Sequence, residues 1–158
     1  MAKVIIQGGI PLKGRVTVSG SKNSALPILA AVSMLDGESV IRNVPSLTDI
    51  TTMVRMLRTL GIKAEFMKNS VKVSSTGNIK HLIPYELVTK MRASFFIAGP
   101  ILAKTGFVKI PMPGGCAIGS RPVDIHLKGF EALGAKIEIE HVFIDIKAEP
   151  DINIMLKL

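Results

Sequence analysis

The sequence repeats itself once, and this repeat limits the folds that the chain can adopt. The residues LGIK at 60–63 and LGAK at 133–136 lie 73 residues apart, and Gly37 and Gly106 lie 69 residues apart. The additional residues of the second copy fall in the loop 111–120. This period is longer than that of the common solenoid repeats. The repeat therefore predicts two copies of one α/β supersecondary unit.

Hydrophobic spacing and turn residues place the elements of each copy, which together give a βαβαββ-like unit. Apolar residues recur at helical spacing in 47–60, whereas β-branched residues alternate in 15–19. The predicted helices are Asn23–Leu35, Leu47–Leu60, Tyr85–Ala103 and Pro122–Leu133. The predicted strands are Lys3–Gln7, Arg15–Ser19, Ser39–Asn43, Lys63–Met67, Ser70–Ser74, Phe107–Ile110, Lys136–Glu140 and Val142–Lys147.

Composition favours a folded chain in a reducing compartment. Hydrophobic residues make up 47% of the chain, which is enough for a core and argues against disorder. The longest apolar runs, 25–35 and 93–103, are shorter than the roughly 20 residues that span a bilayer, so no membrane association is expected. The single cysteine has no partner for an internal disulfide, which fits a cytoplasmic location.

The net charge of +8 favours an anionic partner. Nucleic-acid-binding proteins combine clustered Lys and Arg with aromatic side chains that stack on bases. Here aromatic residues make up 4%, Trp is absent and no long basic run occurs. Small phosphorylated ligands are therefore the favoured partners, and a basic nucleic-acid-binding module remains the weaker alternative.

The first motif that can carry chemistry is SGSKNS at 19–24. Gly20 allows a sharp turn, and Lys22 and Asn23 stand at the predicted start of a helix. Backbone N–H groups and the helix dipole attract an anion there, and Lys22 adds a full charge. The competing interpretation is an ordinary helix cap with a solvated lysine.

The second motif is KMRAS at 90–94. Arg92 is the repeat partner of Asn23, because 69 residues separate them, and both are expected at equivalent helix starts. Arginine suits bidentate binding of phosphate or carboxylate. A surface arginine without a ligand is the alternative.

The third motif is the loop PMPGGCAIGSRPVD at 111–124. Glycine and proline give it no apolar periodicity, and Cys116 lies five residues before Arg121 and near the start of a helix. These neighbours favour a thiolate, whereas a buried and inert thiol is the alternative. The three histidines are scattered and Cys116 has no cysteine partner, so no metal site is predicted.

Together these motifs resemble the UDP-N-acetylglucosamine enolpyruvyl transferase family, which is also called UDP-N-acetylglucosamine 1-carboxyvinyltransferase. The matching stretches include VSGSKNSALPILAA, VTKMRASFFIAGPILA and PGGCAIGSRPVDIHLKGFEALGAKI, and they reach to about Glu149. The resemblance implies an inside-out α/β barrel with three βαβαββ units in each of two domains. This chain would hold two units of the first domain at 21–149, with 1–20 belonging to the second domain and 150–158 diverging.

The resemblance also implies the reaction and its residues. Enolpyruvate passes from phosphoenolpyruvate to the 3′-hydroxyl of UDP-N-acetylglucosamine, phosphate leaves, and no metal or organic cofactor takes part. Cys116 corresponds to the proton donor and to the target of fosfomycin. The substrate-binding positions are Lys22, Asn23 and Arg92 together with the segment Arg121, Pro122, Val123, Asp124 and Ile125.

The chain departs from the family pattern in length, because the family's chain is more than twice as long and carries an aspartate base outside this region. We therefore expect no activity from these 158 residues alone. One piece of a split enzyme, acting with a separate C-terminal chain, and a non-catalytic remnant remain alternatives. Transfer to shikimate 3-phosphate is disfavoured, because that related reaction does not use the loop cysteine.

Overall fold

The computed structural model describes residues 3–9, 11, 13–89, 91–112 and 123–148, with only the backbone at Arg92. The two sequence repeats form two similar units, each with a three-stranded antiparallel sheet. In both units the last strand lies in the middle, so the first two strands run parallel on either side of it. A helix crosses from the first strand to the second.

The first unit contains sheet A, in the order β1-β3-β2. Its elements are α1 (Lys22–Ala31), a 3-10 turn (Val32–Met34), β1 (Glu38–Arg42), α2 (Thr48–Thr59), β2 (Lys63–Met67) and β3 (Ser70–Ser74). The predicted hairpin from Lys63 to Ser74 is confirmed, and its tight turn contains Lys68 with a φ of 50°. Gly61, at φ 89°, ends α2 as predicted.

The second unit contains sheet B, in the order β4-β6-β5. Its elements are α3 (Tyr85–Val88), the 3-10 helix η2 (Arg92–Ile97), α4 (Ala98–Thr105), β4 (Phe107–Pro111), α5 (Asp124–Ala132), β5 (Lys136–Glu140) and β6 (Phe143–Lys147). A feature that sequence patterns missed is a short parallel bridge from Leu82 to Lys109, which covers the free edge of β4.

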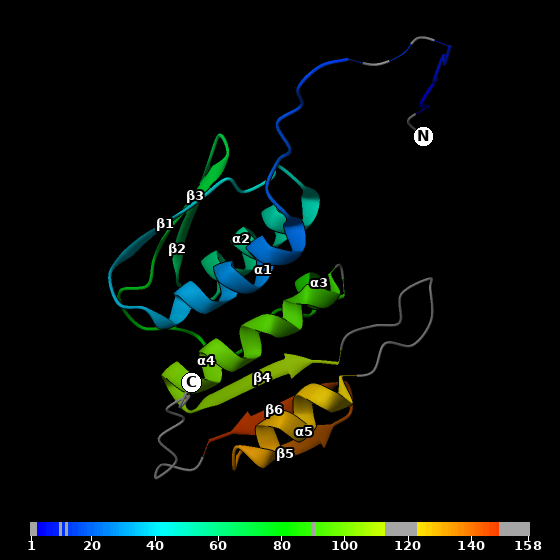
Figure 1. Ribbon diagram of the computed structural model, residues 1–158. Coiled ribbons are helices and arrows are strands. Elements are labelled where there is room, and N and C mark those ends of the chain that lie inside the picture. The colour runs from blue at the N-terminus through cyan, green and yellow to red at the C-terminus, as the bar shows by residue number, and fades with distance from the viewer. Residues whose placement is uncertain (1–2, 10, 12, 90, 113–122, 149–158) are drawn as a thin grey trace.

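Helices α1, α2 and α4 lie between the two sheets, so the helices are inside and the sheets outside (Figure 1). The inner faces of both sheets belong to one apolar core, to which β3 contributes Val71 and β6 contributes Ile146. Helix α5 packs beside α4, where the ring of Phe130 lies 3.7 Å from the position of a Cβ on Gly99. In the described part of the chain, no helix has the length and apolar character needed to cross a membrane.

The predicted strands Lys3–Gln7 and Arg15–Ser19 are wrong for this structure. Both segments form an arm that leaves the body before α1 and carries no strand (Figure 1). Val16 and Val18 remain more than four-fifths exposed. The arm keeps its β-branched sequence, but a strand also needs a neighbour to accept its backbone hydrogen bonds, and no described segment lies beside it.

The predicted helix Tyr85–Ala103 is also wrong as one element, because the structure divides it into α3, η2 and α4. The division lies between α3 and η2, where Met91 is buried in an extended conformation. The hydroxyl of buried Ser94 donates to the carbonyl of Val88 at 3.4 Å, so a side chain satisfies a backbone group that the helix would otherwise pair. The remaining helices and strands agree with prediction to within a few residues.

Candidate functional site

Four helical segments begin at the same end of the molecule. Helices α1, α2 and α5 and the 3-10 helix η2 all start on the right-hand side in Figure 1, where β4 also ends. The first backbone N–H groups of a helix have no partner within it, and the helix dipole gives this end a partial positive charge. The shared end is therefore suited to an anionic ligand.

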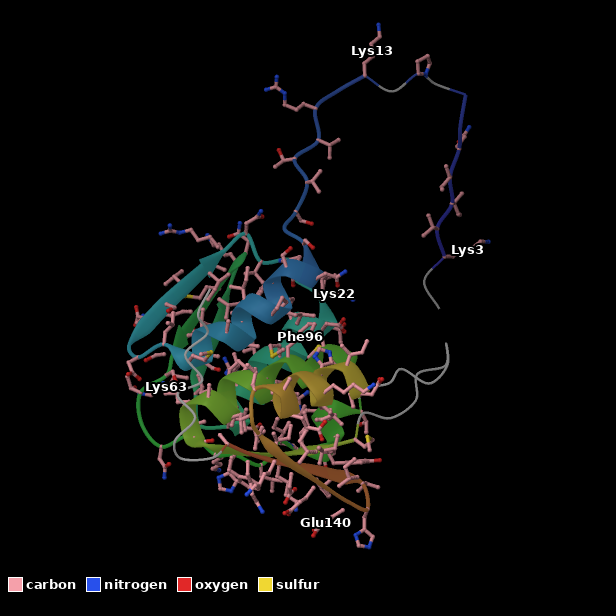
Figure 2. The ribbon with its side chains drawn as sticks, turned by 60° about the horizontal axis from the view of Figure 1, so that its bottom comes forward. Lys3, Lys13, Lys22, Lys63, Phe96 and Glu140 are labelled. Carbon is pink, nitrogen blue, oxygen red and sulfur yellow. The ribbon has the colours of Figure 1, made fainter. Side chains whose placement is uncertain are left out.

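Lys22 is the first residue of α1 and lies beside the point where the arm leaves the body (Figure 2). Its ammonium nitrogen lies 2.7 Å from an oxygen of Asp49, in the first turn of α2. The two side chains are 42% and 33% exposed, so the pair is accessible to solvent. The ammonium group of Lys22 thus lies next to Asp49 and can still contact a bound anion.

Ser21 occupies the predicted N-cap position of α1, but its side chain makes no capping hydrogen bond. Its backbone carbonyl accepts the first helical hydrogen bond, from the N–H of Ala25 at 3.0 Å. Asn23 is exposed next to Lys22. The cation and the amide therefore stand side by side at the start of α1, where their chemistry adds to that of the helix dipole.

Asn23 and Arg92, which the repeat register predicts to be equivalent, both lie near the start of a helical segment. Arg92 is the first residue of η2, as Asn23 is the second of α1, and α1 packs against η2. The structure describes only the backbone of Arg92, so the predicted role of its side chain stays a prediction.

The second unit presents part of the third motif at the same end. Val123 is buried, Asp124 is the exposed first residue of α5, and Ile125 is 78% exposed. Cys116, Arg121 and Pro122 lie outside the described residues, so their predicted roles stay predictions. The strand before that loop, β4, ends and the helix after it, α5, starts at the end where the other helices start (Figure 1).

Sequence reasoning missed two residues of this region, Asp49 and Asn43. Asp49 lies in the first turn of α2, and its carboxylate binds Lys22. The side-chain oxygen of Asn43 accepts a hydrogen bond from the backbone N–H of Gly20 at 3.1 Å. The sequence predicts only a sharp turn at Gly20, and the close approach of Asn43 to its backbone is a finding of the structure.

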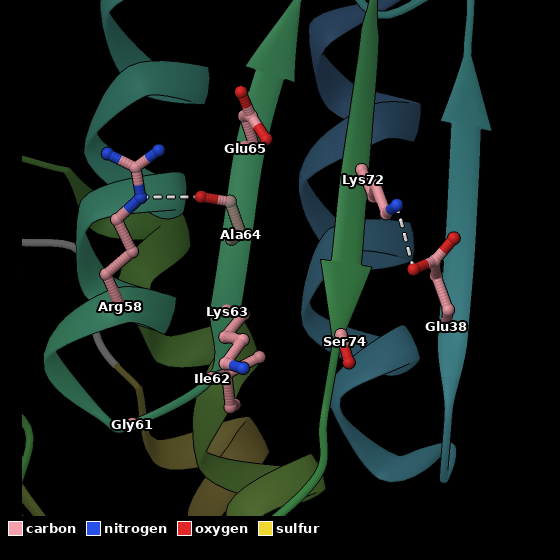
Figure 3. A pocket seen from close by; sticks show the side chains of 9 residues that line it. All are labelled: Glu38, Arg58, Gly61, Ile62, Lys63, Ala64, Glu65, Lys72 and Ser74. Carbon is pink, nitrogen blue, oxygen red and sulfur yellow. Dashed lines mark hydrogen bonds and ion pairs between the residues drawn. The ribbon is translucent and has the colours of Figure 1, made fainter.

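An open pocket of about 640 Å³ lies elsewhere, over the outer face of sheet A (Figure 3). Its charged groups bind within the protein, since Lys72 pairs with Glu38 at 2.9 Å and Arg58 donates to the carbonyl of Ala64. The hydrogen bond and charge of Glu38 raise the pKa of Lys72 above its ordinary value. The charges of Lys72 and Glu38 therefore neutralise each other within this pocket.

Comparison with known proteins identifies relatives along nearly the whole chain. A family model described as EPSP synthase (3-phosphoshikimate 1-carboxyvinyltransferase) matches residues 6–154. The UDP-N-acetylglucosamine 1-carboxyvinyltransferase of Thermotoga petrophila is 48% identical over 149 residues, which cover 94% of this chain and 35% of that protein. UDP-N-acetylglucosamine 1-carboxyvinyltransferase 2 of Carboxydothermus hydrogenoformans is 52% identical over 148 residues, with the same two coverages. The chain thus spans about a third of the length of these relatives.

Solved structures agree on the fold. The enolpyruvyl transferase NikO from Streptomyces tendae matches with a TM-score of 0.75 at 20% identity, over 90% of this chain and 31% of that one. The EPSP synthase from Acinetobacter baumannii matches with a TM-score of 0.52 at 14% identity, over 80% of this chain and 31% of that one. The predicted fold, part of an enolpyruvyl transferase domain, is confirmed. With a family model that covers nearly all of its residues, the chain belongs to the EPSP synthase family of enolpyruvyl transferases.

Proposed function

We propose that this chain supplies the first part of a cytoplasmic UDP-N-acetylglucosamine 1-carboxyvinyltransferase, which provides a precursor for peptidoglycan. The activity is that named for the relatives that are 48% to 52% identical. The observation that carries the proposal is the exposed Lys22–Asp49 pair at the end where four helical segments start. We assign 21–149 to two units of the first domain, 1–20 to the second domain, and 150–158 to a divergent tail.

Phosphoenolpyruvate carries phosphate and carboxylate groups, and both need positive or hydrogen-bonding partners. In the proposed complex Lys22 and Asn23 contact this substrate from the start of α1, Arg92 from the start of η2, and Arg121 from the loop before α5. Charge-assisted hydrogen bonds of this kind are shorter and stronger than neutral ones. They also stabilise the charge that develops when phosphate leaves.

The proposed reaction is an addition followed by an elimination. The 3′-hydroxyl oxygen of UDP-N-acetylglucosamine forms a bond to C2 of phosphoenolpyruvate, its proton passes to a base, and C3 receives a proton. The tetrahedral intermediate then loses a proton from C3 and releases phosphate from C2, which restores the double bond. Cys116 is the proposed donor to C3, because a thiol with a pKa near the working pH exchanges protons efficiently.

The sugar nucleotide is proposed to bind along Arg121, Pro122, Val123, Asp124 and Ile125. The exposed positions of Asp124 and Ile125 at the start of α5 support this assignment, since both are accessible to a ligand. Closure of the glycine-rich loop 111–120 that the sequence predicts would exclude water from the reacting atoms.

The test is phosphate release from phosphoenolpyruvate and UDP-N-acetylglucosamine. Because the chain spans about a third of its relatives, we expect no turnover from the 158 residues alone and turnover once the rest of the enzyme is supplied as a second chain. Replacing Cys116 with serine should abolish turnover of the reconstituted enzyme and its covalent modification by fosfomycin. Turnover by the 158-residue chain alone, or a reconstituted C116S enzyme with wild-type rates, would contradict the proposal.

A further inference from the structure

Two loops approach closely next to Lys22, and the approach depends on Asn43. The backbone N–H of Gly20 donates to the side-chain oxygen of Asn43 at 3.1 Å. A Cβ on residue 20 would lie 1.7 Å from the backbone oxygen of Asn43, so only glycine fits there. Asn43 itself has a φ of 56°, a left-handed conformation that asparagine tolerates better than most residues.

Asn43 is in turn tied to sheet A. It directly follows β1, and the next residue, buried Val44, donates its N–H to the carbonyl of Asn69 at 2.7 Å. Asn69 lies in the turn between β2 and β3. Two hydrogen bonds made by adjacent residues, Asn43 and Val44, therefore connect Gly20, two residues before Lys22, to the sheet.

The same two loops carry the two members of the exposed ion pair. Gly20 leads into α1 and Lys22, while the connection that starts at Asn43 leads into α2 and Asp49. The pair itself cannot fix this geometry, because exposed salt bridges contribute only about 0–1 kcal/mol. The contact between Gly20 and Asn43 restricts the geometry more than the ion pair does, because only glycine fits at position 20.

We propose that Asn43 is a positioning residue that fixes the start of α1, so that Lys22 and Asn23 meet the phosphate-bearing substrate in one geometry. This inference rests on the proposed function, since it assigns Lys22 and Asn23 to phosphoenolpyruvate. Binding groups need support from neighbouring hydrogen bonds, because a small misplacement weakens every contact they make. Asn43 does not touch the substrate and acts through the backbone of Gly20.

The experiment titrates phosphoenolpyruvate into the ¹⁵N-labelled 158-residue chain and follows the amide signals of Lys22 and Asn23. Asn43→Gly keeps the left-handed backbone and removes the acceptor. Asn78→Gly is the matched control, because Asn78 is exposed and its side chain makes no hydrogen bond within the described residues. We expect N43G to weaken binding about three- to tenfold, the net effect of one hydrogen bond, and N78G to leave it unchanged. Equal affinities of the N43G and wild-type chains would overturn the proposal.

A second measurement separates this inference from the proposed function. Backbone order parameters of residues 20–23 should be near 0.85, about the value for rigid backbone, in the wild-type and N43D chains and fall below about 0.6 in N43G. N43D tests rescue, since aspartate keeps the acceptor oxygen. Phosphate release by the reconstituted enzyme tests the proposed function separately. If the wild-type chain binds no phosphoenolpyruvate on its own, the order parameters decide whether Asn43 fixes the helix start. If residues 20–23 stay rigid in N43G, the proposal that Asn43 fixes the helix start is wrong.

Discussion

Lys104 in α4 joins the second unit to the first, and replacing it with methionine measures the contribution of this junction to stability. Its ammonium group lies 2.9 Å from a carboxylate oxygen of Asp36 and 3.0 Å from the hydroxyl of Ser75. It also lies 3.4 Å from the carbonyl of Ser33, at the end of the first helical region. Ser33 and Ser75 are buried, whereas Asp36 is fully exposed. Methionine keeps the apolar stem and removes only the donors.

The expected loss follows from the burial of each partner. The ion pair with exposed Asp36 contributes at most about 1 kcal/mol. Hydrogen bonds from a charged donor to buried groups contribute about 1.5–3 kcal/mol. The carbonyl of Ser33 keeps a second donor, the hydroxyl of Ser75 at 2.8 Å, so its own loss is small. We therefore expect K104M to lower the free energy of unfolding by about 1.5–2.5 kcal/mol, which lowers Tm by about 3–10 °C in a chain of this length.

Urea unfolding followed by circular dichroism measures this change, with D36N as the matched control. D36N removes only the exposed partner and should cost less than about 1 kcal/mol. Two results would refute the reasoning. One is a K104M chain as stable as wild type, and the other is a D36N chain as destabilised as K104M, because the exposed pair would then carry the whole effect.

Three further substitutions test other features of the structure. K22Q should weaken phosphoenolpyruvate binding about 10- to 100-fold in the amide titration, as expected for loss of a charged donor, and leave Tm unchanged within about 2 °C because its ion pair is exposed. G106A should lower Tm by about 2–8 °C, since residue 106 has a φ of 74° and a Cβ there meets no atom within 4 Å, so only backbone strain contributes. The pKa of Lys72 is raised by Glu38, so the stability from this pair is complete below the ordinary lysine value of 10.5 and is lost as the pH rises through the raised pKa. Urea unfolding on both sides of that pH should show a larger loss of stability in wild type than in K72M, which lacks only this pair.

Local sequence signals predicted the strands whose partners are also close in sequence. The hairpin Lys63–Ser74 was predicted to the residue, because β-branched alternation in Val71 and Val73 adjoins a two-residue turn. The same kind of alternation in Val16 and Val18 predicted a strand that is absent. The difference lies in the neighbours: β3 is hydrogen-bonded to β1 and β2, whereas the arm has no described segment beside it.

The site was predictable where one motif contains both the turn and the functional residue. Gly20 and Ser21 indicated a helix start, so Lys22 and Asn23 were placed correctly at the start of α1. The pairing of Lys22 with Asp49 could not be predicted from the sequence, because it depends on how α2 packs against α1. Asn43 was not predicted for the same reason: it contacts Gly20 from 23 residues away, and no periodicity encodes that contact.

The two repeats show how far burial depends on neighbouring elements. Helix α2 buries Ile50, Met53, Val54, Met56 and Leu57, whereas the equivalent helix α5 buries none of its own residues. Both helices follow the first strand of their sheet, so the sequence gives both the same local structure. Helix α2 differs because α1 packs on it and closes the core around it, while Ile125 of α5 stays 78% exposed. An apolar residue at helical spacing therefore becomes a core residue only where a second element covers it, and in α5 the exposed face adjoins the residues proposed to bind the sugar nucleotide.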